Sequence, residues 1–227
     1  PYTTLFRSAW RRMAARYKGC GAIWGFDLAN EPVETLVEEG CDDWHALAER
    51  AAKAVRAVDP ERLLIVEPPD WGGPNGFRDF QPIDVPRVVY SVHMYAPAAF
   101  THQTIHGNEG GRTYPGAIGG THWDKARLEA VLAPVVEFQR RYNAHIYVGE
   151  FSAIRWAPAG SACRWLADVI SIFEAQGWGW SYHAFREWDG WSVEHSPDRN
   201  DRAPAAAPTD RQQLLMKWFA RNEKPAR

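Results

Sequence analysis

Hydrophobic and polar positions along the chain switch between two periods, the alternation of a β-strand and the three-to-four-residue spacing of an amphipathic helix. Compact apolar runs predict strands at residues 22–29, 63–66, 88–94, 146–151 and 178–185. Helical spacing predicts helices at residues 9–17, 43–58, 123–142, 161–176 and 209–221. Because strands and helices alternate, the pattern indicates a parallel sheet and an α/β fold.

Turn and cap residues support these boundaries. Asp59 and Pro60 stop the second helix, Gly177 follows the fourth, and Thr209 is expected to cap the last. Pro134 implies a kink or a helix start inside the third helix. Residues 96–121 are rich in Gly and His, which predicts a long polar loop.

Composition and charge exclude several functional classes. The chain has 227 residues, with 26 Lys and Arg against 28 Asp and Glu, and its basic residues are scattered. Nucleic-acid binding is therefore not indicated. The chain lacks the run of about 18 apolar residues that a membrane-spanning helix needs, and no signal peptide is visible. Cys20, Cys41 and Cys163 are too few for a disulfide framework or a zinc cluster.

Two carboxylates stand where predicted strands end, Glu31 after the first strand and Glu150 in the fourth. In parallel α/β folds the reactive residues gather at this edge. Glycoside hydrolysis requires two carboxyl groups, one to protonate the leaving oxygen and one to attack the anomeric carbon or activate water. Glu31 alone, before Pro32, would be explained as a carboxylate at a helix N-terminus, but its pairing with Glu150 favours catalysis.

Other polar and aromatic residues have two interpretations. Glu67 also ends a strand, and we interpret it as a rim or structural residue. His102 and His106 have a zinc-like spacing, but their Gly-rich surroundings favour a solvated or substrate-facing loop, so no metal site is predicted. Among twelve tryptophans, four fall in Gly/Pro-rich segments, where they either stack on sugar rings or fill a core; these are Trp71, Trp156, Trp188 and Trp191.

Three motifs at predicted strand ends resemble those of glycoside hydrolase family 5, the cellulase family of (β/α)₈ barrels. Residues 25–32 (GFDLANEP) resemble its acid/base motif on the fourth strand. Residues 92–95 (VHMY) resemble the His-x-Tyr of the sixth strand, and residues 148–151 (VGEF) resemble the nucleophile motif of the seventh. Their order and spacing also agree, and the resemblance extends from about residue 21 to the end of the chain.

The resemblance implies a role for each matching residue. Glu31 would be the general acid/base and Glu150 the nucleophile of a retaining mechanism. Asn30 would hydrogen-bond the sugar 2-hydroxyl in the −1 subsite. His93 would line the same subsite, and Tyr95 would hold Glu150.

The last predicted strand departs from the family pattern. Many members carry a Trp there as the floor of the −1 subsite, and His183 takes that position here. Trp180 and Trp188 are the nearby tryptophans that could replace it. The expected substrate-binding residues are therefore Asn30, His93, Tyr95, Trp180, His183 and Trp188.

Counted against the family, the predicted strands are the fourth to the eighth, so the expected fold is an incomplete (β/α)₈ TIM barrel. Residues 1–8 (PYTTLFRS) resemble a translated sequencing adapter, and we expect a non-native leader before a partial barrel domain at residues 9–227. Unpaired strand edges predict that the chain alone is unstable or aggregates, and is inactive or nearly so.

The resemblance implies a glycosidase that hydrolyses a β-linked glucan or mannan. The alternatives are an exo-acting β-glucosidase or glucanase of the same clan, and a non-catalytic carbohydrate-binding barrel fragment. The expected partner is an oligo- or polysaccharide, with no cofactor, metal, nucleic acid or membrane, and the oligomeric state stays open. For a full-length protein we expect secretion or a periplasmic location.

Overall fold

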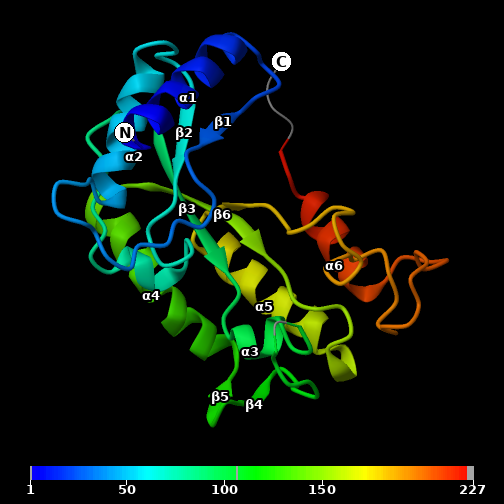
Figure 1. Cartoon of the computed structure of the whole chain (residues 1–227). Helices are drawn as coiled ribbons and strands as arrows, with labels where there is room; N and C mark the ends of the chain where they lie inside the picture. Colours follow the sequence, from blue (N-terminus) through cyan, green and yellow to red (C-terminus); the bar gives the residue numbers. More distant parts are fainter. Residues whose placement is uncertain (1, 106, 224–227) are drawn as a thin grey trace. The chain divides into compact units, whose positions relative to one another are not determined.

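The computed structural model describes residues 2–105 and 107–223, which fall into two compact units (Figure 1). Unit 1 is formed by Pro1–His93 and Leu132–Gly149, and unit 2 by Met94–Val131 and Glu150–Arg227, within the described ranges. The chain therefore passes between the units within β3, α4 and β6, whose bounds follow.

Helices and strands alternate along most of the chain. The helices are α1 (Tyr2–Tyr17), α2 (Trp44–Arg56), α3 (Ala98–Thr101), α4 (Lys125–Tyr142), α5 (Ser161–Ala175) and α6 (Asp210–Phe219), with short 3₁₀ helices at Pro74–Phe77 and Pro158–Gly160. The strands are β1 (Gly25–Asp27), β2 (Leu63–Val66), β3 (Val88–Met94), β4 (Gly116–Ile118), β5 (Thr121–Trp123), β6 (His145–Phe151) and β7 (Gly179–Trp180). Among the described residues, no helix is long and apolar enough to cross a bilayer.

The main sheet has five strands in the order β1-β2-β3-β6-β7. β2 pairs in parallel with β1 and β3, with Asp27 beside Ile65 and Val66 beside Tyr90. The parallel strands and intervening helices confirm the predicted α/β class. A closed barrel of this type has eight strands, so the observed sheet is incomplete by that measure.

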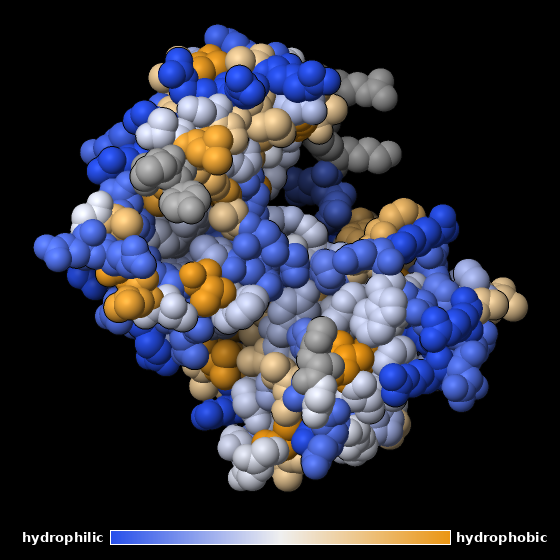
Figure 2. All heavy atoms as spheres, in the orientation of Figure 1, coloured by the Kyte–Doolittle hydropathy of each residue, from blue (hydrophilic) through white to orange (hydrophobic). Residues whose placement is uncertain are grey.

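One face of the unit 1 sheet packs against helices. Trp10 of α1 lies 5.7 Å from Phe26 of β1, and Tyr90 of β3 lies 4.9 Å from Phe138 of α4, measured between ring centroids. Burial of such large aromatic side chains is a major favourable contribution to folding. Outward-facing residues of α1 and α2 are mostly hydrophilic on the face that Figure 2 shows.

Side-chain caps mark the starts of two predicted helices. Asp43 accepts a hydrogen bond from the Ala46 amide at 2.7 Å, and Thr209 accepts one from the Gln212 amide at 3.1 Å. These contacts satisfy amides that have no partner within the helix. Helix α1 begins at Tyr2, seven residues before the predicted helix start at residue 9, so the proposed leader is helical where the structure describes it. Its non-native origin stays a prediction.

Three sequence predictions were wrong in extent. The first predicted strand, residues 22–29, is shortened to the three residues of β1. The last predicted strand, residues 178–185, is reduced to β7, because tertiary contacts draw the following chain out of the sheet: the Tyr182 hydroxyl donates to the Trp191 carbonyl at 2.6 Å. Residues 96–121 are more than a loop, since they contain α3 and the strand β4, which forms an antiparallel hairpin with β5. His106 lies outside the described residues.

Candidate active site

His93, at the end of β3, lies between two carboxylates of unit 1. Its Nδ1 is 2.9 Å from Oε1 of Glu31, in the loop after β1. Its Nε2 is 3.1 Å from Oε1 of Glu67, the residue that follows β2. The side chains of His93 and Glu67 are 3% and 0% exposed, whereas that of Glu31 is 26% exposed. The cluster therefore presents Glu31 to solvent and keeps its partners buried.

Glu67 is the buried anchor of this cluster, so of the two interpretations of it, rim or structural residue, the rim one is wrong and the structural one agrees with its burial. Its Oε2 accepts the backbone N–H of Glu31 at 2.8 Å, and its carbonyl accepts the indole N–H of Trp44 at 2.7 Å. Glu31 has a left-handed backbone with φ 48°, a conformation that costs a non-glycine residue about 1–3 kcal/mol. The hydrogen bond from Glu31 to Glu67 stabilises that conformation.

Asp27, on β1, places a second carboxyl group beside Glu67. Its side chain is partly open to solvent, yet the protein atoms packed around the carboxyl group and the charge of Glu67 raise the pKa of Asp27 to about 8. A hydrogen bond to Glu67 also favours the protonated form, while the charge of His93 acts in the opposite direction. Asp27 therefore keeps its proton at neutral pH and donates it to Glu67.

Two glycines leave the space that this cluster needs. A Cβ at Gly72, whose φ is +63°, would lie 2.5 Å from Oε2 of Glu67, and the Gly72 carbonyl accepts the His93 amide at 2.8 Å. A Cβ at Gly149 would lie 2.5 Å from Oγ of Ser91 and 3.2 Å from Nε2 of His93. Any larger residue at either position would displace the buried polar groups.

Unit 2 carries Glu150, at the end of β6, with two partners. The hydroxyl of Tyr95, just after β3, donates to Oε2 of Glu150 at 2.8 Å. Nδ1 of His183 lies 3.8 Å from Oε1 of Glu150, and Nε2 lies 3.0 Å from Oε2 of Glu187. The Glu150 side chain is 22% exposed, so a ligand can reach a carboxylate that the protein already holds in one orientation.

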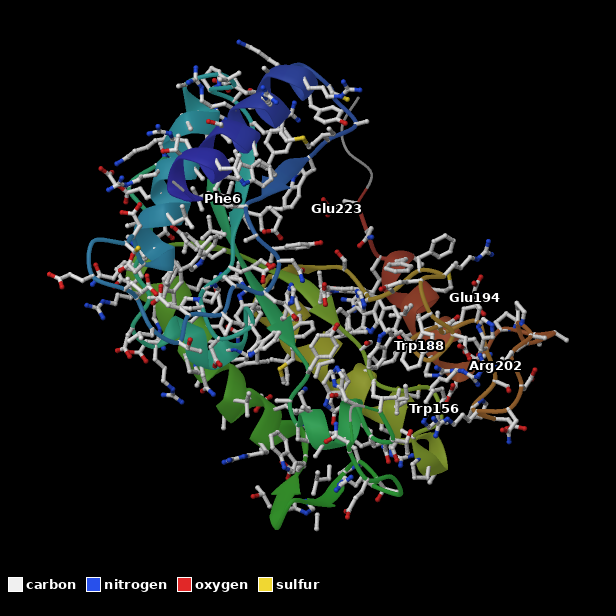
Figure 3. The ribbon with its side chains drawn as sticks, in the orientation of Figure 1. Phe6, Trp156, Trp188, Glu194, Arg202 and Glu223 are labelled. Atoms are coloured by element: carbon white, nitrogen blue, oxygen red, sulfur yellow. The ribbon has the colours of Figure 1, made fainter. Side chains whose placement is uncertain are left out.

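Trp191 joins the partners of Glu150 into an aromatic cluster. Its ring centroid lies 6.2 Å from Tyr95, 6.5 Å from His183 and 5.4 Å from Trp188. Trp191 is buried, whereas Trp188 is 37% exposed and also contacts Trp156 (Figure 3). The sequence marks Trp191 only as an aromatic residue in a loop, and its contacts with Tyr95 and His183 could not be predicted from it.

Arg155 fixes the segment that carries Trp191. Its side chain is fully buried and its guanidinium donates to Oδ2 of Asp189 at 2.9 Å. It also donates to the carbonyl groups of four residues further along, which are Ser196, Asp198, Arg199 and Asp201. A single buried cation therefore holds residues 189–201 in place.

The remaining predicted site residues lie at differing distances from these clusters. Trp180 stacks on Phe219 of α6 at 5.4 Å and contacts Phe151 at 5.5 Å, so the structure places it against α6 rather than beside Glu150. Asn30 is exposed and directly precedes Glu31. Trp71 is 59% exposed, which suits stacking on a ligand.

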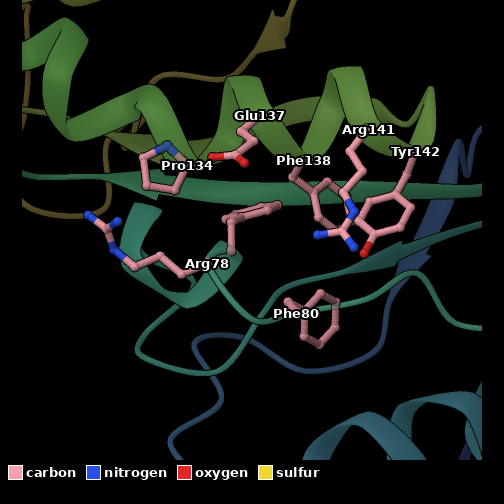
Figure 4. Close-up of a pocket in the computed structure, with 8 residues that line it drawn as sticks. Arg78, Phe80, Pro134, Glu137, Phe138, Arg141 and Tyr142 are labelled. Atoms are coloured by element: carbon pink, nitrogen blue, oxygen red, sulfur yellow. The ribbon is translucent and has the colours of Figure 1, made fainter.

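A separate cavity of about 120 Å³ lies on the helix-facing side of the unit 1 sheet (Figure 4). Residues of α4 line one wall, and the segment from Phe77 to Phe80 lines the other. Phe80 and Phe138 both contact Tyr90 of β3, which faces away from His93 because side chains alternate along a strand. This cavity is therefore not part of the carboxylate cluster.

The chain is similar to known cellulases. The family model described as cellulase (glycosyl hydrolase family 5) matches residues 2–188. Endoglucanase C of Acetivibrio thermocellus is 29% identical over 205 residues, which cover 78% of this chain and 59% of that protein. An endoglucanase of Paenibacillus polymyxa is 36% identical over 107 residues, which cover 40% of this chain and 27% of that protein.

Solved structures confirm the barrel class. Structures of Thermotoga maritima Cel5A in complex with cellobiose and with mannotriose are 26% identical, with TM-scores of 0.76 and 0.75. They match 94% of this chain, which spans 66% of their length. The fold is thus an incomplete (β/α)₈ barrel, as predicted. With the family model matching most of its residues, the chain belongs to glycoside hydrolase family 5, the cellulase family.

Proposed function

We propose that this chain carries the catalytic residues of a retaining glycoside hydrolase that cleaves a β-linked glucan or mannan. The observation that carries the proposal is that a neighbouring side chain holds each of the two carboxylates in place. Glu31 contacts the buried His93, and Glu150 accepts a hydrogen bond from Tyr95. Glucan as substrate is supported by the similarity to endoglucanases, and mannan by the Cel5A complex with mannotriose.

In the proposed reaction, Glu150 attacks the anomeric carbon while Glu31 protonates the departing glycosidic oxygen. The bond to the leaving group breaks as the bond to the Glu150 carboxylate forms, which gives a glycosyl ester. Glu31, now ionised, removes a proton from water, and the resulting hydroxide displaces Glu150. Two inversions at one carbon give net retention.

Neighbouring residues would orient the reacting groups. Tyr95 holds one oxygen of Glu150, so that the other is available for attack. His93 fixes the orientation of Glu31. We propose that Asn30 binds the sugar 2-hydroxyl. Further binding contacts to sugar are proposed for His183 and Trp188, which contact Trp191 beside the partners of Glu150.

Trapping of the covalent intermediate tests the nucleophile. Incubation with a 2-fluoro cellobioside that has an activated leaving group should add one glycosyl unit to Glu150, detected by peptide mass spectrometry. Glu150→Gln should abolish both labelling and hydrolysis but keep cello-oligosaccharide binding. The matched control Glu129→Gln, at an exposed position of α4, should label normally. Labelling at another carboxylate would contradict the assignment.

A second assay tests Glu31 and separates the enzyme from a binding-only protein. Glu31→Ala should lose hydrolysis of unactivated oligosaccharides by a factor of roughly 10²–10⁴, the usual contribution of general acid/base catalysis. Added azide should restore turnover of an activated aryl glycoside with a β-glycosyl azide as product. Both assays apply to this chain and to any longer gene product that contains it. Sugar binding without turnover in every form would favour the non-catalytic alternative.

A further inference from the structure

Glu67 contacts the proposed acid/base along two routes, through the backbone and through His93. Its Oε2 accepts the Glu31 amide at 2.8 Å, while its Oε1 lies 3.1 Å from Nε2 of His93. The other ring nitrogen, Nδ1, lies 2.9 Å from Oε1 of Glu31. Polar atoms are therefore continuous from the fully buried Glu67 to the solvent-accessible Glu31.

We propose that Glu67, with Asp27 behind it, is a positioning residue that keeps a proton on the His93–Glu31 pair. The inference rests on the proposed acid/base role of Glu31. Neither Glu67 nor Asp27 touches the sugar in this scheme, because Glu67 acts through His93 and the Glu31 amide, and Asp27 acts through Glu67.

The burial of Glu67 makes its negative charge effective. Its side chain has no exposed area, and a charge in such surroundings acts on a neighbour 3.1 Å away more strongly than it would in water. An anionic Glu67 favours a proton on Nε2 of His93. The lone pair of Nδ1 can then accept a hydrogen bond from the protonated carboxyl group of Glu31.

Asp27 decides where the negative charge of the carboxyl pair lies. Two adjacent carboxylates repel each other, so one of them retains a proton. Packing around Asp27 and the charge of Glu67 raise the pKa of Asp27 to about 8. At neutral pH the proton is therefore on Asp27, and the charge stays on Glu67, which faces His93.

The titratable groups around this cluster come from successive strands and their ends. Asp27 lies on β1, Glu31 in the following loop, Glu67 after β2 and His93 on β3. Because strongly interacting groups titrate together, a change at one carboxyl group must appear in the titration of the others. A residue at position 67 that only fills space, without a charge beside His93, would not show that coupling.

An NMR titration of the isotope-labelled chain tests the role of Glu67. Glu67→Gln keeps an oxygen that can accept the Glu31 amide but removes the charge. We expect the titration midpoint observed at the His93 ring to fall by about one pH unit, a roughly tenfold loss of proton affinity. The control Glu137→Gln, on the exposed face of α4, should leave the midpoint unchanged. An unchanged midpoint in folded E67Q would overturn the proposal.

Asp27→Asn tests the same proposal independently, including the case in which E67Q does not fold. Asn keeps a hydrogen-bond donor for Glu67 but cannot ionise. The wild-type His93 signals should show an inflection near pH 8, where Asp27 loses its proton, and D27N should lack it. An inflection that persists in D27N would overturn the proposal.

These readouts separate the inference from the proposed function, because the NMR signals need no turnover. Where hydrolysis is measurable, E67Q should also move the basic limb of the kcat/KM profile down by about one pH unit, with KM little changed. If the His93 titration depends on Glu67 as expected but hydrolysis survives Glu31→Ala, the proposed function is contradicted and the inference about Glu67 is not. An acid/base role for Glu31 without coupled titration would contradict the inference alone.

Discussion

The hydroxyl of Tyr95 donates a 2.8 Å hydrogen bond to Oε2 of Glu150, which joins the segment after β3 to the end of β6. A hydrogen bond to an ionised group contributes about 1.5–3 kcal/mol. Because the Tyr95 ring also packs near Trp191, the hydroxyl is held without freedom to turn away. The proposed nucleophile is thus oriented before a substrate arrives.

Tyr95→Phe should therefore reduce kcat/KM by roughly 10–100-fold, which corresponds to the loss of that one hydrogen bond. The ring and its packing remain, so the thermal transition should change little. Steady-state kinetics on a β-glucan oligosaccharide measure the effect. Tyr142→Phe, at the end of α4, is the control, and an equal loss in both variants would contradict the proposed role of Tyr95.

Gly72→Ala should destabilise the chain, because the added Cβ would lie 2.5 Å from Oε2 of Glu67 at a backbone φ of +63°. The positive φ alone costs about 1 kcal/mol, and displacement of Glu67 adds to it. Gly40→Ala separates the two effects, since Gly40 has φ +79° but nothing within 4 Å of its Cβ position. Urea unfolding of both variants should show the larger loss for G72A, and equal losses would exclude the steric explanation.

Asp27 should make the stability of the chain depend on pH. Its pKa is raised from 3.8 to about 8 in the folded state, so the folded state binds the proton more tightly than the unfolded chain does. The associated stabilisation is present below about pH 4 and is lost as the pH rises towards 8. The unfolding temperature of Asp27→Asn should therefore rise relative to that of the wild type as the pH increases from roughly 5 to roughly 8, because only the wild type loses stability in that window. A constant difference across this range would contradict the raised pKa.

Arg155→Lys should loosen residues 189–201. Lysine cannot reproduce the several directed donors of the guanidinium, so partly buried carbonyl groups lose hydrogen bonds to a charged group that contribute about 1.5–3 kcal/mol each. Limited proteolysis should cut this segment faster in R155K. Arg202→Lys, at an exposed position of the same region, should be cut at the wild-type rate. Equal protection of R155K and the wild type would contradict the anchoring role.

The central strands could be predicted from the sequence to the residue. β2 and β3 match their predicted bounds, because strands buried on both faces give mainly apolar runs that polar or turn residues delimit. β7 could not be predicted, since its apolar continuation bends away towards contacts with Trp191 that local pattern does not encode.

The candidate site could be predicted only in part, because some of its residues are marked by their position in the sequence and others only by their partners in the fold. Glu31 and Glu150 could be picked out as candidates because both stand at or near the carboxyl ends of predicted strands, a position that the sequence alone shows. The carboxyl pair of Asp27 and Glu67 could not, because only the register of β1 against β2 brings the two residues together. Asp27 looks like an ordinary polar position in an alternating strand until its neighbour is known.

Gly149 has a consequence for how this site can change during evolution. A Cβ there would lie 2.5 Å from Oγ of Ser91 and 3.2 Å from Nε2 of His93, although Gly149 itself bears no reactive group. The position next to the proposed nucleophile is thus sterically tied to the strand that carries the partner of the proposed acid/base. Natural variants with Ala at 149 should therefore carry Gly or Ala at 91, so that the two positions covary rather than drift separately.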